Sequence, residues 1–216
     1  MKPFLKSLLV TIVTIGCLEA VHAQIAPKTM SLGMTVDFGH HKNKEDPSYQ
    51  KNFILLPDLQ YFVKENRAIV GGILFSSYEY TYQGNFVGRP ALYKVNDQGV
   101  GGFVGIRNLY PIKEKFYLFT DFGLMYSRFK SEQTITDNPN SSISNDYDNR
   151  SYRVRGYAGL GLLYFLNQKF SLETNLLNAG ISYSTPLGDQ SVKVHHWNFD
   201  IDGRLNNLSF GLRYYF

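Results

Sequence analysis

The sequence predicts an all-β protein that forms a closed, eight-stranded, antiparallel up-and-down transmembrane β-barrel. Two features of the whole chain favour this class: eight segments alternate with a period of two, and no segment after residue 23 reaches the roughly 20 apolar residues of a membrane-spanning helix. The clearest alternation is in Leu208–Phe216, where large apolar side chains alternate with Ser209, Gly211, Arg213 and Tyr215. Such a strand suits lipid on one face and a polar lumen on the other, although an amphipathic strand of a soluble sandwich has the same period.

The N-terminus reads as a secretory signal peptide. Lysines precede an apolar core at 8–18, and Val21-His22-Ala23 places small residues near the expected cleavage site. We therefore expect residues 1–23 to be a cleaved signal peptide and residues 24–216 to form the barrel domain.

Composition narrows the class further. The chain has 22 basic and 18 acidic residues, and removal of Lys2, Lys6 and Glu19 leaves 20 and 17, a net charge of +3 that is too small to indicate a nucleic-acid partner. The only cysteine, Cys17, would leave with the signal, so the mature chain needs no disulfides. The 16 Tyr and 16 Phe suit strands and the aromatic girdles of a membrane barrel.

Each predicted strand presents one apolar face. The strands are Met30–Phe38, Phe53–Val63, Ala68–Tyr80, Gly99–Tyr110, Phe116–Phe129, Tyr152–Leu166, Phe170–Ser184 and Trp197–Phe216. Their outward residues include Met34, Leu59, Ile73, Val104, Leu124, Leu162, Leu176 and Leu212, in chain order. In the second strand Pro57 has no N–H to donate, which predicts a bulge or a missing hydrogen bond there.

The connections alternate in length. Those at 64–66, 111–115 and 167–169 are tight turns, whereas the long polar ones are 39–52, 81–98, 130–151 and 185–196. Short periplasmic turns and long external loops are the plan of an outer-membrane barrel, with both termini in the periplasm. Within the third long connection, Thr134–Arg150 is rich in Asn, Asp and Ser and is expected to be a mobile loop.

Two hairpins and the C-terminal strand resemble a known family. The hairpins are Leu55–Gly72 and Phe103–Gly123, and the terminal strand reads LSFGLRYYF. They are similar to the small eight-stranded outer-membrane β-barrels of Gram-negative bacteria, of the OmpX, OmpA-transmembrane and OmpW-like type, most of all to the set common in Bacteroidetes. The resemblance implies an outer-membrane location, contact with outer-membrane lipid and lipopolysaccharide, and recognition of the strand ending in Phe216 by the barrel-assembly machinery.

Inward charges predict an ion network in the lumen. An eight-stranded barrel encloses an interior that side chains fill, and isolated charges there would be costly. Arg107 and Asp121 lie symmetrically about the turn near Glu114, so antiparallel pairing sets them nearly opposite each other.

Three further residues are expected to join this network. Glu173 and Arg213 lie at similar heights on adjoining strands, and Asp58 is a candidate partner for Arg107. Gly33 would lie close to Arg213 and leave room for its stem. The network is either a structural plug that fixes strand register or a narrow ion path or gate, and we favour the plug.

We therefore expect an integral outer-membrane barrel with a side-chain-filled lumen and a structural or surface-interaction role through its long loops. The alternatives are OmpW-like passage of small apolar molecules through a lateral opening, at Pro57 or at Asn178-Ala179-Gly180, and narrow, porin-like transport. No cofactor or metal is expected.

Catalysis is not expected. Ser182, Ser184 and His195 lie near one rim, the arrangement that a lipid-modifying barrel would need, but no motif or spacing singles them out. The pairs His40-His41 and His195-His196 are compatible with a metal or a pH response, and ordinary loop histidines are the favoured interpretation.

Overall fold

The computed structural model describes residues 25–42, 48–86, 89–138, 141–187, 195–203 and 208–216. These residues form β1 (Met30–Lys42), β2 (Tyr49–Lys64), β3 (Arg67–Phe86), β4 (Arg89–Lys113), β5 (Phe116–Asn138), β6 (Ser141–Phe165), β7 (Phe170–Leu187), β8 (His196–Gly203) and β9 (Leu208–Tyr215). In this part of the chain no helix has the length and apolar character needed to cross a membrane. The predicted signal peptide, residues 1–23, lies outside the described residues.

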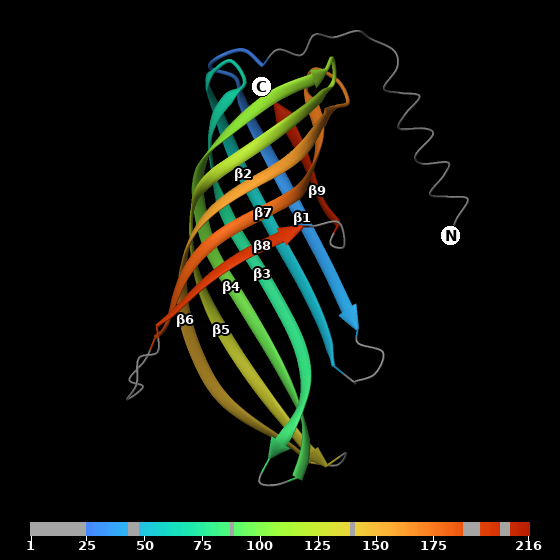
Figure 1. The fold of residues 1–216 in the computed structure, drawn as a ribbon, viewed down its shortest axis with the longest axis vertical. Helices are drawn as coiled ribbons and strands as arrows, with labels where there is room; N and C mark the ends of the chain where they lie inside the picture. The colour runs from blue at the N-terminus through green and yellow to red at the C-terminus, as the bar shows by residue number, and fades with distance from the viewer. Residues whose placement is uncertain (1–24, 43–47, 87–88, 139–140, 188–194, 204–207) are drawn as a thin grey trace, which may run out of the picture.

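The strands close into a ring. Neighbours pair in the order β6-β5-β4-β3-β2-β1-β9-β7, and β6 pairs with β7 to complete the circle, every pair being antiparallel (Figure 1). The shortest pairing in the ring is the β7–β9 seam, which has four residue pairs, from Phe170↔Tyr214 to Glu173↔Gly211. The predicted all-β, closed up-and-down barrel is confirmed.

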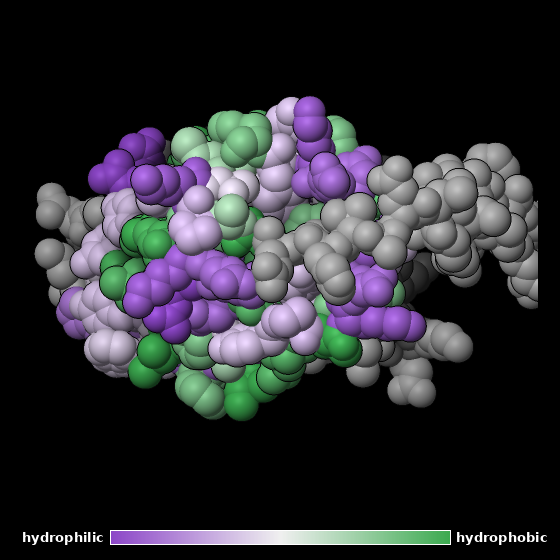
Figure 2. Space-filling model, turned by 90° about the horizontal axis from the view of Figure 1, so that it is seen from above, coloured by the Kyte–Doolittle hydropathy of each residue, from purple (hydrophilic) through white to green (hydrophobic). Residues whose placement is uncertain are grey.

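The two ends of the barrel differ. At one end β2–β3, β4–β5 and β6–β7 are joined by short turns, and the C-terminus lies there too (Figure 1). We call this the short-turn end. At the other end, the ribbon end, the hairpins β1–β2, β3–β4 and β5–β6 project. In the view onto the short-turn end, hydrophilic residues cover much of the face and most hydrophobic patches lie toward its rim (Figure 2).

Alternation gives the barrel an apolar outer band. Leu32, Val104, Leu124 and Phe210 are each 55–61% exposed on the outer face, whereas Arg213 points inward and is fully buried. Aromatic residues border the band at the short-turn end (Tyr61, Tyr110, Phe116, Phe170, Tyr214) and toward the ribbon end (Phe38, Phe53, Phe75, Tyr126, Trp197). On β5 ten residue steps separate these borders, which at about 3.4 Å per residue and a tilt near 40° is about 25 Å, the height of a lipid-facing band.

Three connections predicted as long loops are largely paired strands. β3 and β4 pair without interruption from Arg67↔Asn108 to Phe86↔Arg89. β1 and β2 pair as far as Lys42↔Tyr49, and β5 and β6 as far as Asn138↔Ser141. Most of the described part of Thr134–Arg150 is therefore strand, and the prediction of a loop there is wrong. In the fourth connection, 188–194 lie outside the described residues.

Aromatic contacts across the strands explain why these ribbons form. The rings of Tyr82 and Tyr93 stack with centroids 4.9 Å apart and planes 6° apart, and Gln133 Nε2 donates to Tyr82 Oη over 3.2 Å. Beside them the side chains of Val95 and Ile135 are buried. Such cross-strand pairs stabilise a ribbon without any lipid contact, so its sequence lacks the continuous apolar face that marks the wall strands.

The predicted eighth strand is two strands in the structure. β8 pairs with β7 from Gly203↔Leu177 to His196↔Ser184. In contrast, β9 pairs with β1 and, at the short-turn end, with the first residues of β7. The outward residues are odd-numbered in β8 (Trp197, Phe199 and Ile201) and even-numbered in β9. One regular strand cannot hold both sets on one face, so β8 and β9 are separate strands.

Two local irregularities occur in the wall. Pairing of β2 with β3 skips from Leu55 to Asp58, which confirms the missing bonds expected at Pro57. In β7 the register against β6 shifts by one residue at Leu176, so Leu177 points outward in place of Leu176, contrary to the sequence-based prediction.

Close packing at Gly161 of β6 provides a test of the inward-facing wall. A Cβ there would lie 2.2 Å from Phe119 Cζ and 2.5 Å from the Thr174 carbonyl oxygen, and Phe119 is fully enclosed. We expect Gly161→Ala to lower the free energy of unfolding by about 1–3 kcal/mol, the cost of overpacking. At Gly156 of the same strand a Cβ would meet nothing closer than 3.7 Å, so Gly156→Ala is the matched control and should change stability by less than about 0.5 kcal/mol. Urea unfolding followed by Trp197 fluorescence measures both, and equal effects would contradict this packing.

Candidate functional site

The lumen at the short-turn end is filled by an apolar cluster. Its members are Ile25, Phe62, Ala68, Leu109, Tyr117, Phe119, Leu163, Phe165 and Tyr215, all buried. The sequence predicted a polar, side-chain-filled lumen, whereas this end of the lumen is apolar. The sequence contains a signal for this cluster. Near the ends of several strands, apolar residues occupy inward positions that are polar elsewhere along the strand. Ile25 belongs to this cluster although it precedes β1 and is not part of a strand of the ring.

Arg107 of β4 is held by two carboxylates across the lumen. Its Nε and Nη2 each donate to Asp121 of β5 over 2.7 Å, in the two-point geometry that suits a guanidinium and a carboxylate. Its Nη1 donates to Glu173 of β7. Arg107 and Asp121 are direct partners in the β4–β5 register, which places them opposite each other.

Arg213 of β9 lies beside this pair. Its Nη1 and Nη2 donate to the two oxygens of Asp58 over 2.7 and 3.0 Å, and Nη2 donates to Glu173 over 2.7 Å. Glu173 therefore bridges both arginines, one on each carboxylate oxygen.

Asp58 binds Arg213, whereas the sequence suggested it as a partner for Arg107. The strand register explains the choice. On β1, Gly33 pairs with Asp58 of β2 on one side and with Arg213 of β9 on the other. A Cβ at Gly33 would lie 2.5 Å from Arg213 Cζ, so the guanidinium passes directly over the glycine to reach the carboxylate. Gly33 lies close to Arg213, as the sequence predicted. The space over the glycine holds the guanidinium group of Arg213 rather than its aliphatic stem.

Two contacts of this network were missed at the sequence level. Turned with its oxygen toward the guanidiniums, the Gln60 amide accepts from Arg107 Nη1 over 3.0 Å and from Arg213 Nη2 over 2.9 Å. The Arg107 guanidinium also lies 4.2 Å from the centroid of the Phe119 ring, a cation–π contact that joins the network to the apolar cluster. The signal for Gln60 was its place two residues after Asp58, on the same face of β2.

The network spans the lumen and connects its walls. Asp58 and Gln60 (β2), Arg107 (β4), Asp121 (β5), Glu173 (β7) and Arg213 (β9) come from five of the eight strands of the ring. Relative exposures of 0% for Arg213, 4% for Glu173 and 7% for Arg107 leave little of the network in contact with water. The charges are paired and buried, so breaking one of these ion pairs would leave an unpaired buried charge.

A small cavity lies on the ribbon-end side of the network. It is about 90 Å³ and is lined by Asp58, Arg107, Asp121, Arg155 and Tyr157 among others. Arg155 in turn forms an ion pair with Asp200 of β8. The cavity has room for a few water molecules and is well below the roughly 300 Å³ of a typical ligand pocket.

The described residues contain no group of three or more His, Cys, Asp and Glu side chains that could hold a metal ion. His195 Nδ1 is 2.6 Å from the Tyr183 hydroxyl and its ring stacks on Tyr183, so this histidine of the hypothetical lipid-modifying site is engaged with a tyrosine. His40 lies on β1, and β8, which begins at His196, is hydrogen-bonded only to β7 among the described strands. The two histidine pairs are therefore not joined by strand pairing.

Comparison with known proteins gives structural neighbours. No protein-family model matches the chain, and no curated protein matches it. The structure is similar to the N-terminal β-barrel domain of Pseudomonas aeruginosa OprF (12% identity, 88% of this chain and 98% of that chain, TM-score 0.37) and to Ail, the attachment invasion locus protein of Yersinia pestis (14%, 88% and 99%, 0.39). It is also similar to a major outer membrane protein from Thermus thermophilus (15%, 87% and 98%, 0.41). The architecture described above rests on this chain's own strand pairing and does not depend on these likenesses.

The arrangement of this barrel is that of a membrane protein. Its apolar side chains face outward in a band about 25 Å high, and its charges pair inside a closed ring. Closed antiparallel barrels of this kind span outer membranes. The structure therefore has the architecture of a transmembrane β-barrel.

The bridge through Glu173 generates a stability prediction. Glu173→Gln keeps the shape and removes the charge shared by Arg107 and Arg213, so we expect the free energy of unfolding to fall by about 3–5 kcal/mol, as when one partner of a buried ion pair is lost. The control is Glu132→Gln, which loses an ion pair with Lys130 whose side chains are 49% exposed, and should cost less than about 1 kcal/mol. Urea titrations in the same detergent compare the two, and a smaller loss for Glu173 than for Glu132 would be inconsistent with a bridging role.

Proposed function

We propose that the protein is a closed, non-enzymatic barrel whose role is to anchor β-ribbons beyond the outer membrane for envelope structure and surface interaction. The observation that carries this proposal is the ion network of Arg107, Arg213 and their three carboxylates, which spans the lumen. Next to it, the apolar cluster fills the short-turn end.

The orientation follows from the asymmetry of the ends. Outer-membrane barrels place their short turns in the periplasm and their long connections outside. The ribbon end is then extracellular, and β3, β4, β5 and β6 carry paired backbone beyond the aromatic border at Phe75 and Tyr126. Paired ribbons give a partner a more rigid surface than free loops would.

Further elements of this proposal come from the sequence. The resemblance of Leu55–Gly72 and Phe103–Gly123 supports assignment to the Bacteroidetes-type small barrels. The strand ending in Phe216 suits recognition by the barrel-assembly machinery, and outer-membrane lipid and lipopolysaccharide are the expected surroundings. Neither a cofactor nor nucleic acid enters the proposal.

Planar-bilayer recording of the purified protein tests the closed lumen. We expect no discrete current steps, because a row of bonded side chains fills the cross-section next to an apolar cluster. A channel-forming barrel in the same lipid is the positive control. Reproducible steps from folded protein, identified by its heat-modifiable migration on SDS gels, would refute the closed barrel and favour narrow, porin-like transport.

A second candidate function is lateral passage of a small apolar molecule, and the free edge of β8 favours it. Among the described strands only β7 pairs with β8, and β8 ends at Gly203 opposite Leu177. The outward residues of β8 lie level with the lipid-facing Ile181 and Tyr183 of β7. An unpaired edge at membrane depth is tolerated where it lines a cavity. The site suggested at Asn178-Ala179-Gly180 is paired with β6 on one side and with β8 on the other, so an opening would lie at the free edge of β8.

Dye uptake by cells tests this second function. Lateral passage predicts faster entry of an apolar naphthylamine dye when the protein is present. Gly159→Phe, which fills the luminal cavity, should abolish the gain. Gly156→Phe, three residues away on the outer face, is the matched control and should keep it. Equal uptake with and without the protein would eliminate lateral passage.

A further inference from the structure

The positive charge of the chain is concentrated at the short-turn end of the barrel. Six cations lie in or beside the turns of this end: Lys28, Lys64, Arg67, Lys113, Lys115 and Lys169. The acidic residues there are Glu65 and Glu114, so the net charge is +4, which the terminal carboxylate of Phe216 lowers to +3. The rest of the chain after residue 23 has 14 basic and 15 acidic residues. The excess of positive charge therefore belongs to one end of the barrel.

Most of these cations are exposed and lack an acidic partner. Lys28, Lys64, Lys113 and Lys169 are exposed, and no ion pair within the described part of the chain includes any of them. Lys115 is half-buried and interacts with other groups of the protein. Hydrophilic residues cover much of the face seen in Figure 2, which looks onto this end. The charge of this end is thus directed toward its surroundings.

Arg67 adds a further exposed cation to this end. Its Nε donates to Asn108 Oδ1 over 2.7 Å, and because the amide is neutral the bond orients the guanidinium without cancelling its charge. Arg67 is also paired directly with Lys64 across the β2–β3 turn, so two cations lie side by side there.

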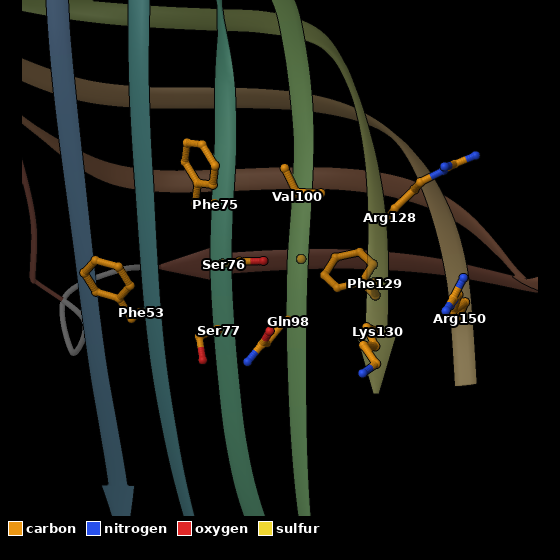
Figure 3. A pocket seen from close by; sticks show the side chains of 11 residues that line it. Phe53, Phe75, Ser76, Ser77, Gln98, Val100, Arg128, Phe129, Lys130 and Arg150 are labelled. Carbon is orange, nitrogen blue, oxygen red and sulfur yellow. The ribbon is translucent and has the colours of Figure 1, made fainter. Parts of the chain in front are cut away.

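The cations on the ribbon side of the wall have partners within the protein. Figure 3 shows Arg128, Lys130 and Arg150 along one side of an outer cavity of about 860 Å³. Arg128 Nε donates to Tyr126 Oη over 3.1 Å, and Lys130 forms an ion pair with Glu132 at 2.8 Å. Lys130 and Arg150 have additional interactions with the protein. The ribbon side therefore carries cations without the excess that marks the short-turn end.

The cations of the short-turn end lie just beyond the aromatic border of the apolar band. Lys64 follows the outward Tyr61 by three residues, Lys113 follows Tyr110 by three, and Lys169 directly precedes Phe170. At about 3.4 Å per residue and a tilt near 40°, three residues span about 8 Å along the membrane normal. This is the depth of phospholipid head groups, where long lysine side chains can hold their ammonium groups. Turns this short stay at the membrane surface.

We propose that the short-turn end binds anionic phospholipids of the leaflet that it faces. Their phosphates lie against Lys64, Arg67, Lys113 and Lys169, which we call the cationic collar, and their acyl chains lie against the aromatic border. A cation close to an anionic lipid surface gains about fivefold in affinity. Ile112, which is 63% exposed beside Lys113, adds an apolar contact at the boundary between head group and acyl chain.

This inference rests on the proposed function, because the orientation proposed there makes this leaflet the periplasmic one. The lipid preference itself requires only that the barrel spans a bilayer with its short turns at one surface. It does not depend on whether the lumen conducts, so the two proposals can fail separately.

Quenching of tryptophan by brominated lipids tests the collar in vesicles that contain the full, folded protein. The sole tryptophan, Trp197, reports the ribbon-side border, and the double variant Tyr110→Trp/Trp197→Phe moves the reporter to the short-turn end. The vesicles mix phosphatidylglycerol with phosphatidylcholine, and one of the two lipids is brominated at a time. We expect phosphatidylglycerol to be favoured about fivefold or more at the short-turn end. Salt at about 1 M should bring this preference close to unity, because it screens exposed charges.

Collar variants in the same reporter background separate charge from shape. K64Q/K113Q/K169Q should remove most of the preference for phosphatidylglycerol, whereas K64R/K113R/K169R keeps the charge and should retain it. The matched control K51Q/K94Q/K130Q removes three cations of the ribbon side, 49–58% exposed, and should leave the preference at the short-turn end unchanged. With the reporter at Trp197, K64Q/K113Q/K169Q should have no effect. Heat-modifiable migration checks the folding of every variant.

Two results would overturn the inference. One is equal quenching by the two lipids at the short-turn end, and the other is a preference that survives in K64Q/K113Q/K169Q. If equal quenching is accompanied by co-sedimentation with purified peptidoglycan that K64Q/K113Q/K169Q abolishes, the collar binds the cell-wall polymer instead. A folded, non-conducting protein without lipid preference would refute this inference alone, whereas a conducting protein with the preference would refute the closed barrel alone.

Discussion

Hydrocarbon cannot hydrogen-bond to a peptide group, and this constraint shapes the whole molecule. Backbone groups within the membrane must be satisfied by the protein itself, so the sheet has to close. Closure passes through the short seam between β7 and β9, where four residue pairs complete the ring. With the ring closed, the period of two assigns every other side chain to lipid and the rest to the lumen.

The luminal network follows from that assignment. The parity that exposes Leu212 to lipid sends Arg213 inward, where an unpaired charge would be costly. Glu173 resolves this by accepting from both arginines at once, and Gly33 leaves the space in which Arg213 reaches Asp58. The same bonds that neutralise these charges also cross the lumen and connect its walls. What the protein does beyond the membrane then depends on the outer wall and the ribbons.

How far the sequence predicted the structure depended on whether a contact is local. The Arg107–Asp121 pair follows from a hairpin register that a short turn fixes, and it was accessible from the sequence. The Asp58–Arg213 pair was not, because it depends on β1 lying between β2 and β9, strands from opposite ends of the chain.

The ribbons and the last strand were mispredicted for different reasons. In the ribbons, aromatic pairs such as Tyr82–Tyr93 replace lipid contact, so alternation is no longer visible against polar neighbours. In Trp197–Phe216, the change from odd to even apolar positions was visible in the sequence and signalled two strands.

The most direct measurement of the central claim is oxygen accessibility along β5 in a lipid bilayer, with single spin-labelled cysteines. The mature chain is expected to lack cysteine, so labels placed one at a time from Leu118 to Leu124 report each position separately. The account predicts a period of two, with high accessibility at Leu118, Phe122 and Leu124 and low accessibility at Phe119 and at the other odd-numbered positions. Uniform accessibility, or maxima at the odd-numbered positions, would contradict it.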